Sequence, residues 1–312
     1  MARTGISQAL LFTEMARLGL STRGELVRHT GMTKASISRI IDQLLESGWV
    51  SEGHKIQNDR PGRPTSQLIA RPDLAYVVGT DLEGSAIRAC VLDCARQPVV
   101  CGRRNIDTTW SSERILAEWA ELIRETVGNS KVDPEDIAGM GLGLPGLYHR
   151  KKQNVHAYLP PGRWVDFAVQ PLFDSLDMEF TGANNMLCVS EYERRSGAGI
   201  GQKTFLSVLV RYGIGAALFA REQFLAGEDV FCGELGHMRI RADGPECICG
   251  QTGCLDSFAS GRIWPAGDER TGDEWWDFLG GSSRALAVGI ANIIKIFPSP
   301  TVILNGIYND YQ

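Results

Sequence analysis

Three cysteines crowd into the stretch PECICGQTGCLDSFAS, residues 245–260, and two glycines lie between them. These residues are Cys247, Cys249, Gly250, Gly253 and Cys254. Glycine permits the tight backbone path that brings three sulfurs to one point. A structural zinc ion needs four nitrogen or sulfur ligands in a tetrahedron, so this loop strongly constrains the fold around it.

The fourth ligand is sought upstream, in the segment CGELGHMRI. His237 lies ten positions before Cys247 and supplies an imidazole nitrogen. Cys232 is also nearby, but it precedes a glycine and lacks the loop geometry. The sequence therefore predicts a structural zinc site, and the competing interpretations are a redox pair or buried inert thiols. The predicted ligands are His237, Cys247, Cys249 and Cys254.

The chain has 312 residues, of which 43% are hydrophobic and 22% charged, as in ordinary globular proteins. No apolar run approaches the roughly 20 residues that span a bilayer. Glu14 and Arg17 interrupt the apolar N-terminal segment, so it does not resemble a signal peptide. We therefore expect a cytoplasmic protein without membrane insertion. In the cytosol the thiols stay reduced, so a disulfide framework is not expected.

Charge is distributed unevenly along the chain. Residues 1–72 carry ten Lys and Arg against six Asp and Glu, whereas the remainder carries 22 against 31. A small basic N-terminal segment (the head, residues 1–72) followed by a larger acidic remainder (the body, residues 73–312) is typical of a nucleic-acid-binding module attached to another domain. A chance fluctuation of local charge would give the same numbers.

The basic head contains three predicted helices. Apolar residues recur at helical spacing in ISQALLFTEMARLG, TRGELVRHTG and TKASISRIIDQLLESG. Thr22 and Thr33 are suited to cap the second and third helices, and Gly31 follows the second. Two short helices, a glycine-containing turn and a longer third helix predict a helix-turn-helix.

The third predicted helix begins with small, polar and basic side chains, which can enter the major groove. The following segment predicts a β-hairpin whose tip, NDRPGRP, can place arginines in a minor groove. The head is thus predicted to be a winged helix-turn-helix, and the alternative is a three-helix packing module with a surface hairpin. The candidate DNA-binding residues are Thr33, Lys34, Ser36, Ser38, Arg39, Arg60 and Arg63.

The body predicts an α/β fold, because strands alternate with helices and glycine-rich turns. Residues 76–93 and 204–220 both read as strand, turn, strand, which indicates duplicated halves. A turn that cradles phosphates has the pattern D-x-G-G-[ST], whose glycines admit the phosphates to the backbone. Here the turn is Asp81-Leu82-Glu83-Gly84-Ser85, and the Glu83 carboxylate would repel a triphosphate. We therefore favour a structural turn over a nucleotide site.

The segment GELGHMRI followed by CICGQTGCLDSFAS resembles the signature of the ROK family of repressors, open reading frames and kinases. The resemblance extends over essentially the whole chain, including the Asp81 turn, the GLGLPG strand, the loop around Trp164, the helix at Asn185 and the ILNGI turn. It implies an α/β, actin-like (ribonuclease H-like) sugar-kinase fold in two lobes, with a sugar site against the zinc loop. The expected division is a winged helix-turn-helix over 1–72 and a sugar-sensing domain over 73–312, with lobes near 73–182 and 183–312.

The resemblance also assigns roles to single residues. Family kinases carry an Asn-Asp-x-Asn segment whose Asp is the general base, and counting back from Glu191 places that base at Ala183. Without a carboxylate no group takes the hydroxyl proton, so kinase activity is not expected. Asp256 stands where the family has Glu. Glu234 is implied to bind the effector, and its alternative role is to orient His237. The effector-binding residues implied are Gly146, Asn185, Glu234, His237 and Asp256.

The N-terminal winged helix-turn-helix matches the repressor branch of the family, so we expect a DNA-binding regulator, a repressor, of carbohydrate genes. Its expected partners are a double-stranded DNA operator, a sugar or sugar-derivative effector, and further copies in a homodimer or homotetramer. Family members usually continue with helices beyond the position of Asn305, whereas this chain ends at Gln312. The alternatives are an ATP-dependent sugar kinase with an accessory head, and a regulator controlled by a protein partner.

Overall fold

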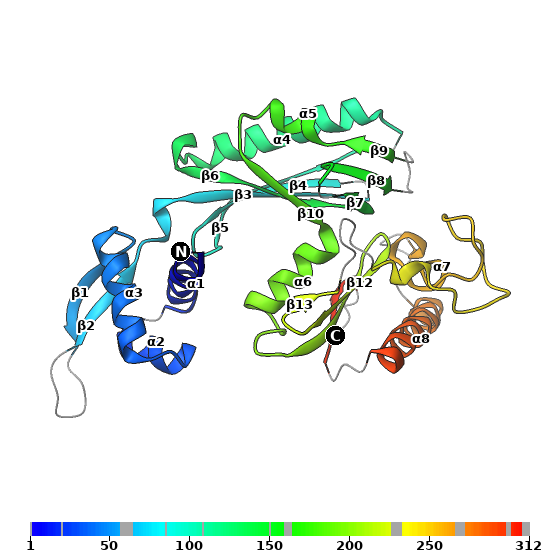
Figure 1. The fold of residues 1–312 in the computed structure, drawn as a ribbon. Coiled ribbons are helices and arrows are strands. Elements are labelled where there is room, and N and C mark those ends of the chain that lie inside the picture. The colour runs from blue at the N-terminus through cyan, green and yellow to red at the C-terminus, as the bar shows by residue number, and fades with distance from the viewer. Residues whose placement is uncertain are drawn as a thin grey trace.

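The computed structural model describes residues 2–19, 21–56, 65–84, 86–107, 109–149, 151–158, 164–225, 233–265, 272–297 and 301–307. A helical head with a β-hairpin comes first, followed by two lobes that are each built on a sheet (Figure 1). Within these ranges no helix combines the length and the apolar character that crossing a bilayer requires.

The head is a winged helix-turn-helix, as predicted. Its helices begin and end where the capping residues place them: Thr22 accepts a hydrogen bond from the Glu25 amide, Thr33 from the Ser36 amide, and Gly31 is left-handed. The antiparallel wing follows. The wing tip over 57–64, with Arg60 and Arg63, lies outside the described residues. The elements are α1 (Ala2–Leu18), α2 (Arg23–Thr30), α3 (Lys34–Glu46), β1 (Val50–Ile56) and β2 (Thr65–Ala70).

The first lobe has a five-stranded sheet in the order β10-β6-β3-β4-β5. A short 3-10 helix, η1 (Pro72–Leu74), leads into it from the wing. Its strands are β3 (Tyr76–Glu83), β4 (Ala86–Asp93), β5 (Pro98–Asn105), β6 (Ile137–Leu144) and β10 (Phe180–Asn184). Helix α4 (Ser112–Ser130) packs on the sheet through the fully buried Trp119, whose indole N–H donates to Thr80 Oγ1 at 2.6 Å. Burial of the indole is thereby achieved without leaving its N–H unpaired.

Smaller elements complete the first lobe. A 3-10 helix, η2 (Pro134–Asp136), precedes β6, and a three-stranded antiparallel sheet with one short helix separates β6 from β10. These elements are β7 (Leu147–His149), β8 (Asn154–Tyr158), β9 (Trp164–Ala168) and α5 (Gln170–Asp174).

The second lobe follows α6 (Asn185–Ser196) and has a four-stranded sheet in the order β13-β12-β11-β14. Its strands are β11 (Thr204–Val210), β12 (Ile214–Ala220), β13 (Gln223–Phe224) and β14 (Val302–Gly306). Its helices are η3 (Leu235–His237), α7 (Asp256–Ala259), η4 (Gly261–Ile263) and α8 (Gly272–Ile296). Leu255 and Leu286 pack against the buried side of the hairpin β11–β12 and close the core.

The two lobes repeat one arrangement, as the sequence indicates. In each, an antiparallel hairpin is joined by a later strand that runs parallel to the first strand of the hairpin: β6 beside β3, and β14 beside β11. The expected division between lobes, at 182/183, falls inside β10, and all five residues of β10 pair with β6. The sheet of the first lobe therefore extends to Asn184.

One pair of thiols departs from the expectation of reduced cysteines. Cys90 of β4 lies directly opposite Cys101 of β5, with their Cα atoms 4.1 Å apart, and the two form a disulfide. The expectation rested on the cellular compartment, whereas the strand register alone brings these two side chains together.

The turn between β4 and β5 contacts the head. Cys94 packs against the apolar core of the head, and its amide donates to the Pro72 carbonyl at 3.1 Å. Two residues further on, Arg96 Nη1 donates to Ser196 Oγ at the end of α6 at 2.5 Å. This turn is therefore in contact with both the head and the helix that leads into the second lobe.

Candidate metal centre and adjoining cavity

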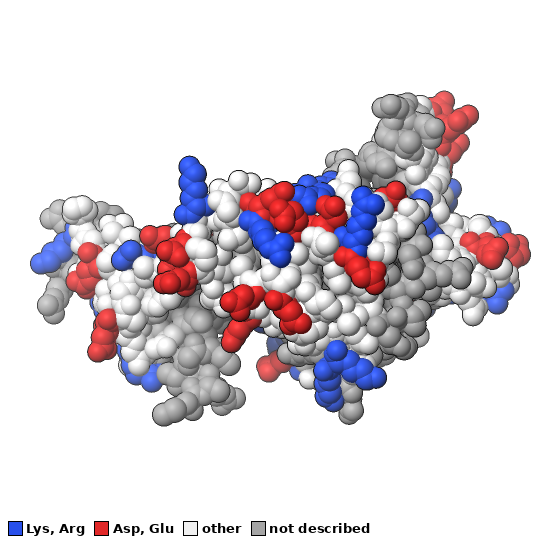
Figure 2. All heavy atoms as spheres, turned by 90° about the horizontal axis from the view of Figure 1, so that it is seen from above, with Lys and Arg blue, Asp and Glu red and all other residues white. Residues whose placement is uncertain are grey.

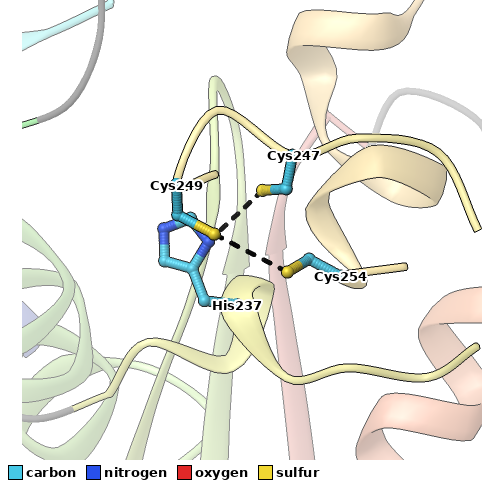
Figure 3. Close-up of side chains that lie close together, drawn as sticks. All are labelled: His237, Cys247, Cys249 and Cys254. Carbon is cyan, nitrogen blue, oxygen red and sulfur yellow. Dashed lines mark hydrogen bonds between the residues drawn. The ribbon is translucent and has the colours of Figure 1, made fainter. Parts of the chain in front are cut away.

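The four predicted metal ligands converge in the structure. His237 ends η3, and the cysteines lie on the loop that precedes α7 (Figure 3). Their ligand atoms all lie within 4.8 Å of one another. His237 Nδ1 is 3.5 Å from Cys247 Sγ, and Cys249 Sγ is 3.7 Å from Cys254 Sγ.

These separations suit a zinc ion. With Zn–S bonds of about 2.3 Å, tetrahedral geometry requires sulfurs about 3.8 Å apart. The loop reaches this arrangement through left-handed glycines, Gly250 at φ 84° and Gly253 at φ 74°. A side chain at Gly253 would also collide with the Arg241 carbonyl oxygen, at 1.6 Å. The donor set of one imidazole and three thiols fits zinc.

The thiols differ in their protonation. Burial opposes ionisation of Cys247, but hydrogen bonds from Cys249, His237 and Ser257 lower the pKa of its thiol to about 7. Burial and the neighbouring thiols raise the pKa of Cys254 to about 12. Three sulfurs this close repel one another as thiolates, and a bound cation would offset that repulsion.

A cavity of about 210 Å³ adjoins the metal cluster. All five candidate effector-binding residues line it: Gly146, Asn185, Glu234, His237 and Asp256. His237 connects the two features, because its Nδ1 faces the cysteines while its Nε2 lies 3.8 Å from Glu234 Oε2. A metal held on Nδ1 would leave Nε2 facing the cavity.

Backbone contacts hold the polar side chains in place. Asp256 Oδ1 accepts the Ile214 amide at 2.9 Å, which ties α7 to β12. Burial raises the pKa of Asp256, although His237 and Arg262 oppose the shift. Burial also raises the pKa of Glu234, an effect that His237 opposes and Asp256 reinforces.

Sequence reasoning missed Asn184. Its amide donates to the Gly146 carbonyl at 2.7 Å, and its side-chain oxygen caps α6 by accepting the Met186 amide at 2.8 Å. It thus joins the end of β6 to the start of α6 at the cavity wall. An asparagine directly before an apolar helical run was the available signal.

The turn predicted to be unsuitable for phosphates is occupied by ion pairs. Arg88 forms a bidentate pair with Asp81, at 2.9 and 2.8 Å, and also reaches Glu83 at 3.1 Å. Arg211, from the second lobe, contacts Glu83 at 2.6 Å. Gly84, at φ 58°, faces the Tyr212 ring closely enough that a Cβ would lie 3.2 Å from it. Glu83 thus links the two lobes, and nothing in the sequence around it indicated Arg211 as its partner.

Ala183 and Gly182 share a cavity with Asn185 but not with the other candidate effector-binding residues. Both line a second cavity, of about 880 Å³, together with Asp81 and Arg88, and neither lines the cavity that contains Glu234. A Cβ at Gly182 would lie 2.6 Å from the Tyr148 hydroxyl. Asn185 lines both cavities. The position counted as the kinase base therefore lines the second cavity and not the cavity that contains His237.

The candidate DNA-binding residues of α3 lie together at its N-terminus. Thr33, Lys34 and Arg39 are exposed, whereas Ser36 and Ser38 are half-buried. Thr33 and Ser36 share a hydroxyl–hydroxyl hydrogen bond of 2.9 Å. On the face of the molecule seen from above, acidic and basic side chains are interspersed (Figure 2).

Comparison with known proteins agrees with this architecture. Residues 77–275 match the model of the ROK family, and residues 3–60 match that of the MarR family. The fold is that of a winged helix-turn-helix joined to a sugar-kinase-like domain. The chain belongs to the ROK family.

Named relatives include both regulators and kinases. A xylose repressor of Caldicellulosiruptor bescii is 23% identical over 96% of this chain and 82% of its own length. A glucokinase of Halalkalibacterium halodurans is 28% identical over 59% of this chain and 56% of its own length. The chain spans 60% to 66% of the length of three further xylose-repressor relatives. The crystal structure of a ROK family transcriptional regulator, a homologue of E. coli MLC, matches 97% of this chain and 84% of its own, with a TM-score of 0.69 and 20% identity.

Proposed function

We propose that this protein is a transcriptional repressor that binds an operator through its winged helix-turn-helix and responds to a sugar or sugar derivative. The observation that carries the proposal is the cavity lined by Glu234, His237 and Asp256 beside the four-ligand cluster, in the same chain as a DNA-binding head. In such a cavity, carboxylates accept hydrogen bonds from sugar hydroxyls, and asparagine amides both donate and accept them. Since it acts on DNA, we place it in the cytoplasm.

The metal cluster has a structural role in this proposal. Zinc held by His237, Cys247, Cys249 and Cys254 would fix the loop that forms one wall of the cavity. The zinc would thereby also hold His237 Nε2 in place beside Glu234 at the cavity. Glu234 is proposed to accept hydrogen bonds from the sugar hydroxyls directly, with orientation of His237 as its lesser role.

The signal is proposed to pass through α6. That helix begins at the cavity with Asn184 and Asn185 and ends at Ser196, where Arg96 contacts it. Arg96 belongs to the turn whose Cys94 packs on the head. A sugar that prefers one placement of α6 would shift the position of the head, and hence the spacing of two heads in a dimer or tetramer.

Catalysis of sugar phosphorylation is the alternative, supported by the kinases among the relatives. The ion pairs of Glu83 with Arg88 and Arg211 count against it, because a carboxylate occupies the turn where phosphates would approach. Ala183 carries no proton acceptor. A coupled ATP assay with glucose, xylose and N-acetylmannosamine decides between a repressor without catalytic activity and a kinase. Turnover well above the no-protein blank would establish a kinase.

Control by a protein partner is the remaining alternative. The experiment is a selection of the sequences that the protein binds from random DNA, at a stated salt concentration, with and without a panel of sugars. It tests DNA binding by the head and sugar sensing by the cavity together. The proposal is supported if one DNA sequence is enriched without sugar and a sugar abolishes that enrichment. Enrichment that no sugar alters, with no thermal stabilisation by any sugar, favours a protein partner. Absence of any enriched sequence contradicts the assignment as a repressor.

A further inference from the structure

The disulfide of the first lobe closes the hairpin that contacts the head. Cys90 of β4 lies opposite Cys101 of β5, at a sequence separation of 11. The tip of this hairpin, residues 94–97, is the turn that contacts both the head and α6. Within the tip, the Cys94 thiol also donates to the Ala75 carbonyl at 3.1 Å. The bond therefore lies at the base of the element that joins the head to α6.

Backbone pairing is irregular between the disulfide and the tip. Val91 pairs with Val100, and the register then shifts, so that the next residue of β4 pairs with Pro98. Proline has no N–H to donate to the ladder. The tip itself is closed by the Asp93 amide, which donates to the Gln97 carbonyl at 3.0 Å, and β3 pairs with every residue of β4. Breaking the disulfide is thus expected to loosen the tip as a unit and to leave the sheet folded.

The two cysteines are accessible to small reagents. Cys101 is exposed and Cys90 is half-buried, and both line the second cavity, of about 880 Å³. Exposed disulfides are the labile and regulatory ones, whereas structural disulfides resist reduction by the cellular thiol pool. In the cytosol, a disulfide that does form is usually transient and catalytic or redox-sensing. Position and accessibility together favour a reversible bond over a permanent one.

We infer that Cys90 and Cys101 are a redox-sensing pair, oxidised by hydrogen peroxide and reduced by a low-molecular-weight thiol, whose bond stiffens the contact between the head and α6. The inference rests on the proposed function for the cytoplasmic setting and for the consequence at the operator. A dimer needs its two heads at a fixed spacing on DNA, so the oxidised protein, with the stiffer tip, is the tighter binder.

The chemistry balances in both directions. In oxidation, one thiolate attacks a peroxide oxygen, the O–O bond breaks, and the departing hydroxide takes the thiol proton to form water and leaves a sulfenic acid. The second thiolate attacks that sulfur, the S–O bond breaks, and a second water leaves as the S–S bond forms. Two thiols thus lose two electrons and one peroxide becomes two waters. In reduction, two thiol molecules attack in turn through a mixed disulfide and leave as their own disulfide.

A redox titration tests whether the bond is reversible. The full zinc-loaded chain is equilibrated in glutathione buffers from strongly reducing to oxidising, quenched with an alkylating reagent and digested with trypsin. Cleavage after Arg96 places Cys90 and Cys101 on different peptides, so mass spectrometry detects the bond as a linked pair. One step from linked to doubly alkylated peptides is expected. A pair that stays linked at every ratio, or that links at none, overturns the inference.

Hydrogen exchange and operator binding test the consequence. Amides of residues 93–97 are expected to exchange severalfold faster in the reduced protein, whereas those of α8 in the second lobe should be unchanged. Operator affinity, measured by anisotropy on the same two forms, should fall severalfold on reduction. Equal tip exchange or equal operator affinity in the two forms overturns the inference. If neither form binds any DNA sequence, the proposed function fails, and the titration and the tip exchange still decide on the redox pair.

Variants assign the effect to these two thiols. The double variant Cys90→Ser, Cys101→Ser should behave as reduced wild type in every buffer. Cys188→Ser removes another cysteine that lines the same cavity and should keep the step. Loss of the step in Cys188→Ser would assign the response to a different pair and contradict the inference. If the double variant does not fold, the comparison of oxidised with reduced wild type still decides.

Discussion

Arg96 and Ser196 are one hundred residues apart in the sequence, and their side chains are hydrogen-bonded at 2.5 Å. This contact joins the turn that packs on the head to the C-terminal end of α6. In the proposed function, a change at the start of α6, in the cavity wall, reaches the head through this contact.

Replacing Arg96 with alanine is therefore expected to uncouple the two sites. Sugar affinity should stay within about twofold of wild type, while the sugar concentration that releases the operator rises severalfold, corresponding to a coupling change of about 1 kcal/mol. Fluorescence anisotropy of labelled operator, with calorimetry of the sugar, measures both. Ser196→Ala should behave alike, and the double variant should be no worse than either single one. Arg103→Ala, an exposed arginine of β5, serves as the control; equal effects from it would refute the path through Arg96.

Metal removal should destabilise the second lobe. His237→Ala or Cys254→Ser is expected to lower zinc content from one ion per chain to a small fraction of that, as measured by elemental mass spectrometry. A loss of about 2 kcal/mol would lower Tm by roughly 4–8 °C for a domain of this size. Cys188→Ser alters a free cysteine outside the cluster and should retain zinc. Wild-type protein that purifies without zinc and gains no stability from it would contradict the metal centre.

DNA affinity should depend on the basic residues of the head. Lys34→Ala, Arg39→Ala and the wing variant Arg63→Ala are each expected to weaken operator binding. A residue that contacts phosphate should also reduce the slope of log affinity against log salt by about 1. Lys295→Ala, at the end of α8 in the second lobe, should leave the slope unchanged. An unchanged slope for Arg63→Ala would remove the wing from the interface.

Glu25 should make the stability of α2 depend on pH. Its carboxylate accepts the Ser21 amide at 2.9 Å, and this backbone hydrogen bond is the main cause of a lowered pKa. Since the folded-state pKa lies below the ordinary value of 4.5, the stabilisation is complete above that value and is lost as pH falls through the lower one. Glu25→Gln should cost about 1 kcal/mol at pH 7 and less in acid.

Hydrogen exchange of the α2 amides across this pH range provides the measurement. Glu46→Gln, which alters an exposed carboxylate at the end of α3, is the matched control and should change protection little at either pH. If Glu25→Gln and wild type show equal protection at pH 7, the Ser21 hydrogen bond contributes nothing to the helix.

The sequence by itself determined the local structure and which four side chains converge in the candidate metal cluster. Thr22, Thr33 and Gly31 specify helix ends through contacts within a few residues, and the strand-turn-strand units are visible in their apolar pattern. The cysteine ligands likewise lie on one short loop, so their spacing and interleaved glycines were sufficient to predict them, and only His237 had to be found upstream.

Only the tertiary structure decided which distant side chains meet. The pairing of Glu83 with Arg211, the contact of Arg96 with Ser196 and the placement of Ala183 in the second cavity depend on how two separate sheets are oriented around α6. Apolar periodicity specifies which face of an element is buried, but not the element it packs against. The long-range partners of charged side chains are therefore set by packing of the whole chain, and the sequence carries no local sign of them.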